Sequence, residues 1–550
     1  MKSAMQPSGL QKSGLRQSMA WLHTWSGLLV CWVLWLIFCA GTASYYRQEI
    51  TLWMTPEWHQ LAMRPADPVA AAERAIDVMQ RRSPHALRWA INLPQARTPA
   101  LRVYWSEPAQ AGSSKRGRFQ NVMLDPDSGA TLPPPRATRG GEFFYRLHFD
   151  LYYMAPETGR WIVGFCTMFM LVAILSGVVT HKRIFKDFFT FRPGKGPRSW
   201  LDAHNAVAVL ALPYHLMITY TGLVATLFLY MPAGVQVAYH GRQAQMDAEM
   251  YPSEPKVKPA GVAAPLTAIA PLMLQAQQRW HGVPAGKVSI DNPNDRHAVV
   301  IIEQRGGAHM SRTQPALVFD GVSGALLSSS GDDAPAAATR NTMVGLHIAN
   351  FAQPALRALF FLSGLAGCAM VATGALLWTL RERNKQRQFG ATLAGRCGLR
   401  LAEGLNLGAI AGLPIAIGAY FWANRLLPLD APLRADLEIH CFFATWAAAA
   451  VLAQLSPGRA MWRAQLALAA LALGGVPLLN GLTTDSHLGV TLLQGRGPLP
   501  VAAFDLTLLG LGLLFAYAAW RLRGPGRAAA VAATPADAAD RHPDPLRELA

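Results

Sequence analysis

The sequence predicts a polytopic α-helical membrane protein with about eight transmembrane helices and two exterior α+β domains. Only 15% of the 550 residues are charged, whereas average soluble proteins carry roughly 25% charged residues. The chain also contains apolar stretches of about 20 residues, the length that a bilayer core requires. They lie at about 19–44, 159–180, 203–231, 355–380, 404–424, 434–455, 464–483 and 501–522.

The charges of the loops predict which side of the membrane each loop occupies, because Lys and Arg are enriched in cytoplasmic loops. The N-terminus, the loop 182–200 and the loop 381–403 are all rich in Lys and Arg. Both termini are therefore expected in the cytoplasm, and the segments 46–147 and 232–344 outside. Much of the net charge of +17 lies in these loops, so we expect membrane lipid as a partner and no nucleic acid.

The expected order along the chain alternates membrane helices with loops and exterior domains. The C-terminal tail is rich in Ala, Pro and Asp, and we expect it to be disordered. The segments are a cytoplasmic N-terminus (1–18), a first transmembrane helix (19–45), a first exterior domain (46–147), a second transmembrane helix (148–181), a basic cytoplasmic loop (182–200), a third transmembrane helix (201–231), a second exterior domain (232–344), a fourth transmembrane helix (345–380), a cytoplasmic loop (381–403), a C-terminal region of four membrane helices (404–522) and a cytoplasmic tail (523–550).

The two exterior segments repeat each other's pattern. Each begins with an amphipathic helix, at 69–82 and 266–280, and continues with short strand-like runs. Each then has a strand, a D-x-x-S-G turn and a second strand, with the turns at 125–129 and 320–324. Asp suits such a turn because it accepts hydrogen bonds from nearby amides, and Gly because it tolerates positive φ. Each repeat is therefore expected to consist of a membrane helix that leads out of the cytoplasm, an exterior domain and a membrane helix that leads back.

Histidines recur at matching places in the two repeats. His23 and His204 stand near the cytoplasmic start of the first and third apolar stretches, at an offset of 181 residues. His148 and His347 precede the second and fourth stretches, at an offset of 199 residues. Histidines at both ends of paired membrane segments indicate axial ligation of haem iron, and so electron transfer across the bilayer.

Bis-histidine ligation needs two neutral imidazoles that face each other from separate helices. In a repeat protein whose axis lies along the membrane normal, equivalent residues face each other. This pairs His23 with His204 and His148 with His347. The sequence has no C-x-x-C-H motif, so we expect two non-covalent b-type haems, one near each membrane face. The alternative is that these are interfacial histidines bonded to loops and lipid headgroups.

Two further histidines are candidate ligands. His215 lies 11 residues after His204, which is about 16 Å along a straight helix, so we expect it near mid-membrane, where an imidazole is costly. Pro213 could bend this helix and open a site; otherwise His215 is a hydrogen-bonded packing residue. His181 could replace His23 as the partner of His204, and the alternative is a helix-end histidine near the helix dipole.

Other cofactor motifs are missing from the sequence. It has no G-x-x-x-x-G-K-[ST] loop, so an ATP-driven pump is not expected, and no G-x-G-x-x-G after a strand. Direct binding of a nicotinamide or flavin by a Rossmann fold is therefore not expected. The electron donor would then be a quinol or a cytoplasmic reductase.

Several short motifs recur in order in the two repeats: Leu22-His23, Leu147-His148, Ala203-His204-Asn205, Thr221-Gly222, Leu346-His347 and the two D-x-x-S-G turns. This pattern resembles the PepSY-associated transmembrane family, and the exterior units resemble PepSY domains. Members of that family include inner-membrane reductases of ferric siderophores, which carry b-type haem between their helices. The resemblance thus implies a bacterial inner-membrane oxidoreductase that serves iron uptake by reducing an exterior ferric siderophore or iron chelate.

Two other functions remain open at this point. PepSY domains resemble the inhibitory pro-segments of peptidases, so the chain could be a peptidase-binding or regulatory membrane protein without redox activity. It could also be a transporter that uses the last four helices as a permeation path. The visible spectrum of the purified protein separates these functions from a haem oxidoreductase.

Overall fold

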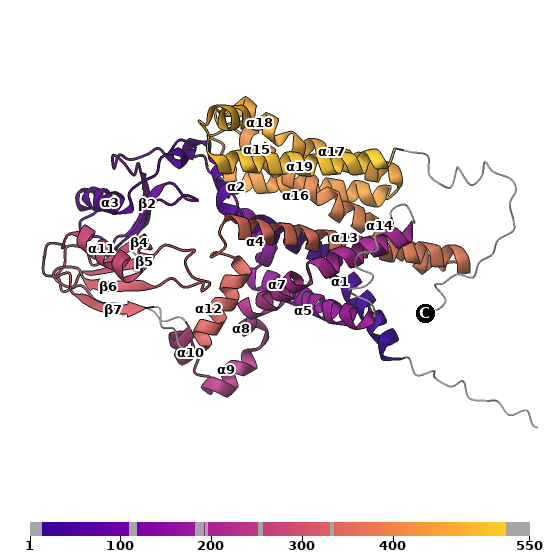
Figure 1. Ribbon diagram of the computed structural model, residues 1–550, viewed down its shortest axis with the longest axis horizontal. Coiled ribbons are helices and arrows are strands. Elements are labelled where there is room, and N and C mark those ends of the chain that lie inside the picture. The colour runs from indigo at the N-terminus through magenta and orange to yellow at the C-terminus, as the bar shows by residue number, and fades with distance from the viewer. Residues whose placement is uncertain are drawn as a thin grey trace, which may run out of the picture.

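The chain folds into a bundle of long helices with a β-sheet at one end (Figure 1). The computed structural model describes residues 14–108, 118–181, 192, 196–250, 257–330 and 335–523. The tail expected to be disordered, from 524 onward, and most of the basic loop expected at 182–200 lie outside the described residues.

The membrane part agrees with the expected number of spans. Among the described residues, 7 helices are long and apolar enough to cross a membrane, or up to 8 spans if one bent pair is counted. The helices of these spans are α1 (Leu15–Ser44), α5 (Pro156–Thr180), α6 (Pro197–Leu210), α7 (Leu212–Ala225), α13 (Pro354–Phe389), α14 (Leu393–Ile410), α15 (Gly412–Leu426), α16 (Arg434–Leu455), α17 (Arg459–Gly474), α18 (Val476–Thr483) and α19 (Leu499–Arg521).

The third span is bent rather than straight. Helices α6 and α7 meet at Ala211 with an angle of 67° between them. Pro213 lies in the first turn of α7. Because proline has no backbone N–H, it cannot donate the hydrogen bond that would continue α6. The structure therefore corrects the straight-helix distance expected between His204 and His215.

The strands of the two segments expected outside the membrane form one continuous sheet, a pairing that the sequence analysis did not predict. In the described part of the chain the strand order is β3-β2-β1-β4-β5-β6-β7. Strand β1 (Arg88–Asn92) pairs antiparallel with β4 (Ala285–Asp291), and this pair joins the two repeats. The pairing covers two strand edges that separate sheets would leave open. The other strands are β2 (Leu101–Ser106), β3 (Phe119–Leu124), β5 (Val299–Gln304), β6 (Ala316–Asp320) and β7 (Leu326–Ser330).

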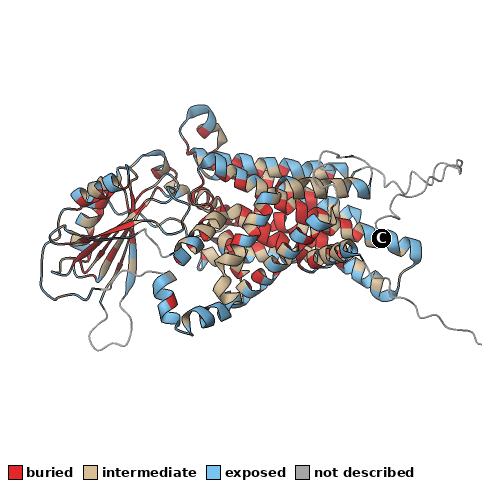
Figure 2. Ribbon diagram, turned by 60° about the horizontal axis from the view of Figure 1, so that its bottom comes forward, coloured by how far each residue is buried: buried red, intermediate tan, exposed pale blue. Residues whose placement is uncertain are grey.

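One face of this sheet is apolar and carries two helices. Alternate strand residues such as Trp89, Val103 and Ile302 are fully buried, as the alternation of side chains across a strand requires. They form one hydrophobic core with α3 (Pro68–Arg82) and α11 (Ile269–Arg279), close to the helices expected from the sequence. Figure 2 shows the buried residues concentrated in this layer and in the centre of the helical bundle.

The two D-x-x-S-G turns form as expected, but the strand after the first turn is missing. Gly129 and Gly324 adopt φ of 71° and 74°, and the Asp320 carboxylate accepts the amide of Ser323 at 2.7 Å. That amide holds the pKa of Asp320 below its usual value. After the first turn only an isolated bridge forms, at Thr131, because three prolines follow and cannot donate to a ladder.

Several short helices and turns join the longer elements of the chain. Two of them, α4 and α12, lead into membrane spans and end close to His148 and His347. The sequence analysis did not predict these helices as separate elements. They are α2 (Arg47–Met54), α4 (Glu142–Asp150), α8 (Leu227–Tyr230), α9 (Pro232–Tyr239), α10 (Gln243–Met250), α12 (Pro335–Ile348), two 3₁₀ turns (Pro56–Trp58 and Leu61–Met63) and a π-helical turn (Gly489–Leu493).

Candidate functional site

The structure places four histidine rings opposite one another in two pairs. The rings of His23 on α1 and His204 on α6 have centroids 6.3 Å apart and an interplanar angle of 69°. The rings of His148 on α4 and His347 on α12 have centroids 5.9 Å apart and an angle of 32°. These are the pairs that the repeat predicts, so equivalent residues of the two repeats face each other.

All four rings are held in the same way, through Nδ1. A hydrogen bond at Nδ1 fixes the tautomer and orientation of the imidazole and leaves the Nε2 lone pair free to bind a metal. Thr221 Oγ1 donates to the Met217 carbonyl, so it accepts from His347. The four contacts are His23 Nδ1 to Ala173 O at 2.8 Å, His148 Nδ1 to Ile37 O at 2.8 Å, His204 Nδ1 to Met370 O at 3.0 Å and His347 Nδ1 to Thr221 Oγ1 at 3.1 Å.

Each ring also lies against a glycine of a neighbouring helix. A Cβ atom added to any of these glycines would meet the ring at close range. The distances from the added Cβ to the nearest ring atom are 2.7 Å for Gly41 and His148, 3.0 Å for Gly222 and His347, 3.1 Å for Gly177 and His23, and 3.3 Å for Gly374 and His204. The glycines recur in the two repeats in the same way as the histidines. Because glycine has no side chain, each of them leaves room for the neighbouring ring.

The sequence analysis missed the role of these glycines, although a signal was present. Gly177 and Gly374 are 197 residues apart, close to the offset of 199 between His148 and His347. Glycine inside a membrane helix is common where another group approaches the backbone closely. Glycines that recur at this offset within apolar stretches therefore indicate close contacts that both repeats share.

The geometry of the pairs fits an iron between the rings. A metal–imidazole nitrogen bond is about 2 Å long, so two axial ligands place their ring centroids roughly 6 Å apart. The observed centroid distances are 6.3 Å and 5.9 Å. All four histidine residues are half-buried, and α6 has no fully buried residue.

The two pairs lie at opposite ends of the same helices. On α1, which is unbroken, His23 lies 18 residues before Gly41, the glycine that contacts His148. At 1.5 Å per residue this is about 27 Å along the helix axis. One pair therefore lies near the end of α1 expected in the cytoplasm, and the other near the exterior end.

His215 is not opposed by another histidine ring. It is fully buried beside the Phe38 ring, with centroids 6.2 Å apart. Neither of its ring nitrogens has a hydrogen-bond partner among the described residues. Both expected roles of His215, haem ligation and packing, stay predictions.

His181 lies beside the pair of His23 and His204 without facing it. Its Nε2 is 3.2 Å from Nδ2 of Asn205, the residue that follows His204. The structure thus places His23, and not His181, opposite the ring of His204. His181 as a replacement ligand remains an untested alternative, and its amide contact points to a supporting role.

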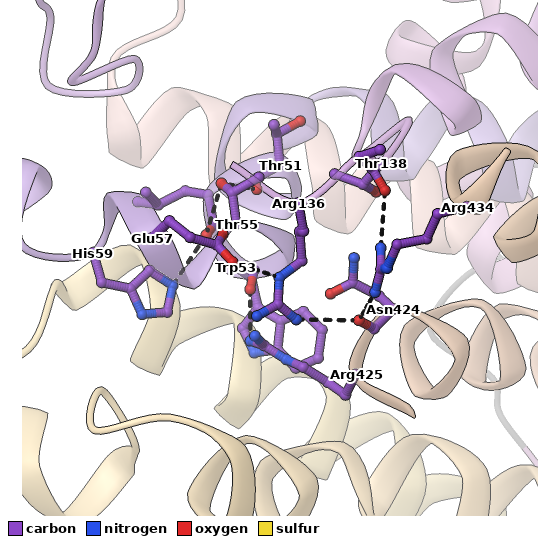
Figure 3. Close-up of polar contacts among 12 residues, drawn as sticks. Thr51, Trp53, Thr55, Glu57, His59, Arg136, Thr138, Asn424, Arg425 and Arg434 are labelled. Carbon is purple, nitrogen blue, oxygen red and sulfur yellow. Dashed lines mark hydrogen bonds and ion pairs between the residues drawn. The ribbon is translucent and has the colours of Figure 1, made fainter. Parts of the chain in front are cut away.

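A second polar cluster, which the sequence analysis missed, lies where the C-terminal helices meet the segment after α1 (Figure 3). Arg425 lies over the Trp53 ring at 4.1 Å and donates to the Trp53 carbonyl at 2.6 Å. Asp505 accepts from Trp53 Nε1 at 2.8 Å. The signal was the presence of charged residues inside apolar stretches, which are costly in a membrane and mark functional or anchoring positions.

His59 lies at the edge of this cluster, outside the membrane spans, and makes the stability of the folded protein dependent on pH. Burial and the nearby Arg425 lower the pKa of His59 to about 4, below its unfolded value of about 6.5. The folded state therefore loses stability as pH falls from about 6.5 towards 4. We expect the thermal midpoint of the wild type to fall more steeply over this range than that of His59→Gln. The exposed His85 provides the matched control, and an equal effect of His85→Gln would contradict the assignment.

Comparison with known proteins adds two findings. The family described as PepSY-associated TM region matches residues 20–381. The uncharacterized protein PA4219 of Pseudomonas aeruginosa is 28% identical over 420 residues, which cover 73% of this chain and 99% of that protein. The family match contains all four paired histidines and ends before the C-terminal helices.

Proposed function

The chain belongs to the PepSY-associated transmembrane family, and we propose that it is a haem b oxidoreductase of a bacterial inner membrane. It would move electrons from the cytoplasmic side to an exterior acceptor, with both termini in the cytoplasm. The observation that carries this proposal is the pair of facing histidine rings at each end of the bundle. Family membership by itself leaves the chemistry open.

The residues around each pair support a role in holding haem. When bound, each haem would accept and release one electron at a time, which is the chemistry that b-type haem supplies. The carbonyls of Ala173 and Ile37 accept from Nδ1 of His23 and His148, which orients the rings and would leave their Nε2 atoms available as ligands. The glycines let the helices approach the rings closely. The surrounding apolar core, including Leu34, keeps water away from the bundle interior.

The proposed acceptor is ferric iron in a siderophore or similar chelate. Hard oxygen ligands hold Fe(III) tightly and Fe(II) weakly, so one-electron reduction outside the membrane releases the iron. The exterior sheet, which we propose is built from two PepSY units, would hold the chelate near the exterior pair. The donor would be a quinol or a cytoplasmic reductase, since the sequence offers no nicotinamide or flavin motif.

The direct test of this proposal is the haem content of the purified protein. We expect about two haems per chain, which acid–acetone extraction removes because no C-x-x-C-H motif exists to bind them covalently. The optical spectrum should be that of low-spin, bis-histidine b-type haem in both oxidation states. Colourless protein from haem-sufficient cells would exclude the proposal.

The glycine contacts lead to a second test with a control on the same helix. In Gly41→Ala the new Cβ would lie 2.7 Å from the His148 ring, so the ring must move. We therefore expect haem affinity at the exterior pair to fall about tenfold, as for other changes beside metal ligands. Gly27→Ala is the control, because no heavy atom lies within 4 Å of its Cβ position. Haem content is measured for both variants. Equal losses of haem would show that the contact between Gly41 and the His148 ring does not affect haem binding.

A further inference from the structure

The C-terminal helices contact the short helix that carries His148. Phe143 and Phe144 of α4 are each 1% exposed. The Phe143 ring lies 4.8 Å from Tyr420 of α15 and 5.0 Å from Phe442 of α16, measured between centroids. The ring of Phe144, one helical turn before His148, lies 5.5 Å from Tyr420. One face of α4 is therefore covered by α15 and α16.

The segment that leads into α4 is held by the same two helices. Arg434 and Glu438 of α16 are almost fully buried and bind each other at 2.6 Å. Arg434 donates to the carbonyl of Ala137 at 2.8 Å, and Glu438 accepts from Thr138 Oγ1 at 2.6 Å. The Tyr420 hydroxyl donates to the carbonyl of residue 140 at 3.0 Å. These bonds fix backbone and side chains immediately before α4.

Buried ion pairs such as Arg434–Glu438 are weak contributors to stability, because desolvation offsets most of their attraction. Their best-supported use is to select one arrangement of the groups around them. Here those groups are residues 137 and 138, which precede the helix of His148. The cluster is thus suited to setting the position of α4.

The second repeat supports its equivalent helix differently. Helix α12, which carries His347, packs on α7 and contacts the loop before β6. Gly345 lies against the carbonyl of Met310, and the carbonyl of Asn341 accepts the amide of Arg312 at 3.0 Å. The two ligands of the exterior pair are therefore held by different parts of the chain.

We propose that helices α15 and α16 position His148 and thereby set the geometry of the exterior histidine pair. The proposal assigns a role to the C-terminal region, which lies beyond the family match. Its redox consequence rests on the proposed haem function. Because protein interiors are close-packed, a change at Tyr420 or Phe442 must move α4 or leave a cavity beside it. A shift of α4 would move the His148 ring relative to His347, and a cavity beside α4 would hold that ring less firmly.

The test compares two substitutions on α15. Tyr420→Ala removes the ring that contacts Phe143 and Phe144. Trp422→Ala removes a larger ring that faces α17 and donates to the Ala472 carbonyl at 2.8 Å, and it is the matched control. Tyr420→Phe keeps the ring and loses only the hydroxyl, so it should restore most of the wild-type behaviour.

Two readouts keep the positioning role separate from the haem function. Hydrogen exchange of residues 142–150 in haem-free protein should increase about tenfold or more in Tyr420→Ala and remain unchanged in Trp422→Ala. In haem-loaded protein, a redox titration should show a shifted potential or lost signal for the exterior haem alone. Faster exchange in a protein that binds no haem would support the positioning role and exclude the proposed function. Unchanged exchange in Tyr420→Ala, or equal changes in both variants, would overturn the positioning role.

Discussion

Replacing His148 or His347 with alanine is expected to remove the exterior haem and to leave the cytoplasmic haem reducible. Each substitution deletes one of two rings that face each other at 5.9 Å, and a single remaining imidazole cannot give bis-histidine ligation. About half of the haem absorbance should be lost in each variant, with the remaining haem keeping its low-spin spectrum. Haem stoichiometry and a redox titration of the purified variants measure this result.

The reciprocal substitutions test the assignment of the pairs. His23→Ala or His204→Ala should remove the cytoplasmic haem and leave the exterior one. His181→Ala is the control, because its ring contacts Asn205 and the ring opposite His204 is that of His23. The pairing would be wrong if His204→Ala and His215→Ala each removed a different haem while His23→Ala removed none.

Transmembrane reduction of a ferric chelate is the second large effect expected. In liposomes with a reductant sealed inside and a ferric chelate outside, the wild type should form exterior Fe(II) at least about tenfold faster than the His148→Ala/His347→Ala double variant. The reason is that the lipid bilayer separates donor and acceptor, so electrons must pass through the protein. A ferrous-specific chromophore outside the vesicles measures the rate.

The control for this experiment is protein-free vesicles, which report leakage of the reductant. Equal rates for wild type and the double variant, both above this background, would mean that the exterior pair is not on the path of the electrons. The sidedness of the reconstituted protein must be determined at the same time, because only molecules with His23 facing the reductant can contribute.

The membrane part of the fold could be predicted well because its signal is long and local. A span needs only about 20 consecutive apolar residues, and the expected spans match the helices of the structure. The pairing of His23 with His204 and of His148 with His347 could also be predicted, because it follows from the order of repeated motifs.

Features that depend on contacts between distant segments could not be predicted in the same way. Strands β1 and β4 are nearly 200 residues apart in the sequence. The sequence of neither strand indicates which other strand it pairs with. The bend at Ala211 was foreseen only as a possibility because proline in a membrane helix does not always bend it. The Arg434–Glu438 pair requires knowledge of which helices are neighbours.

The pairing of β1 with β4 has a consequence for the symmetry of the two repeats. In this pair Ala90 lies directly opposite Ser289, and the two residues are 199 positions apart, the same offset as between His148 and His347. The strand pair and the pair of His148 with His347 are therefore both consistent with one twofold pseudosymmetry axis that relates the two repeats. Each half of the protein then presents surfaces that complement copies of themselves. A single half, such as residues 14–181, is accordingly expected to associate as a dimer, because neither histidine pair can be completed by one half alone.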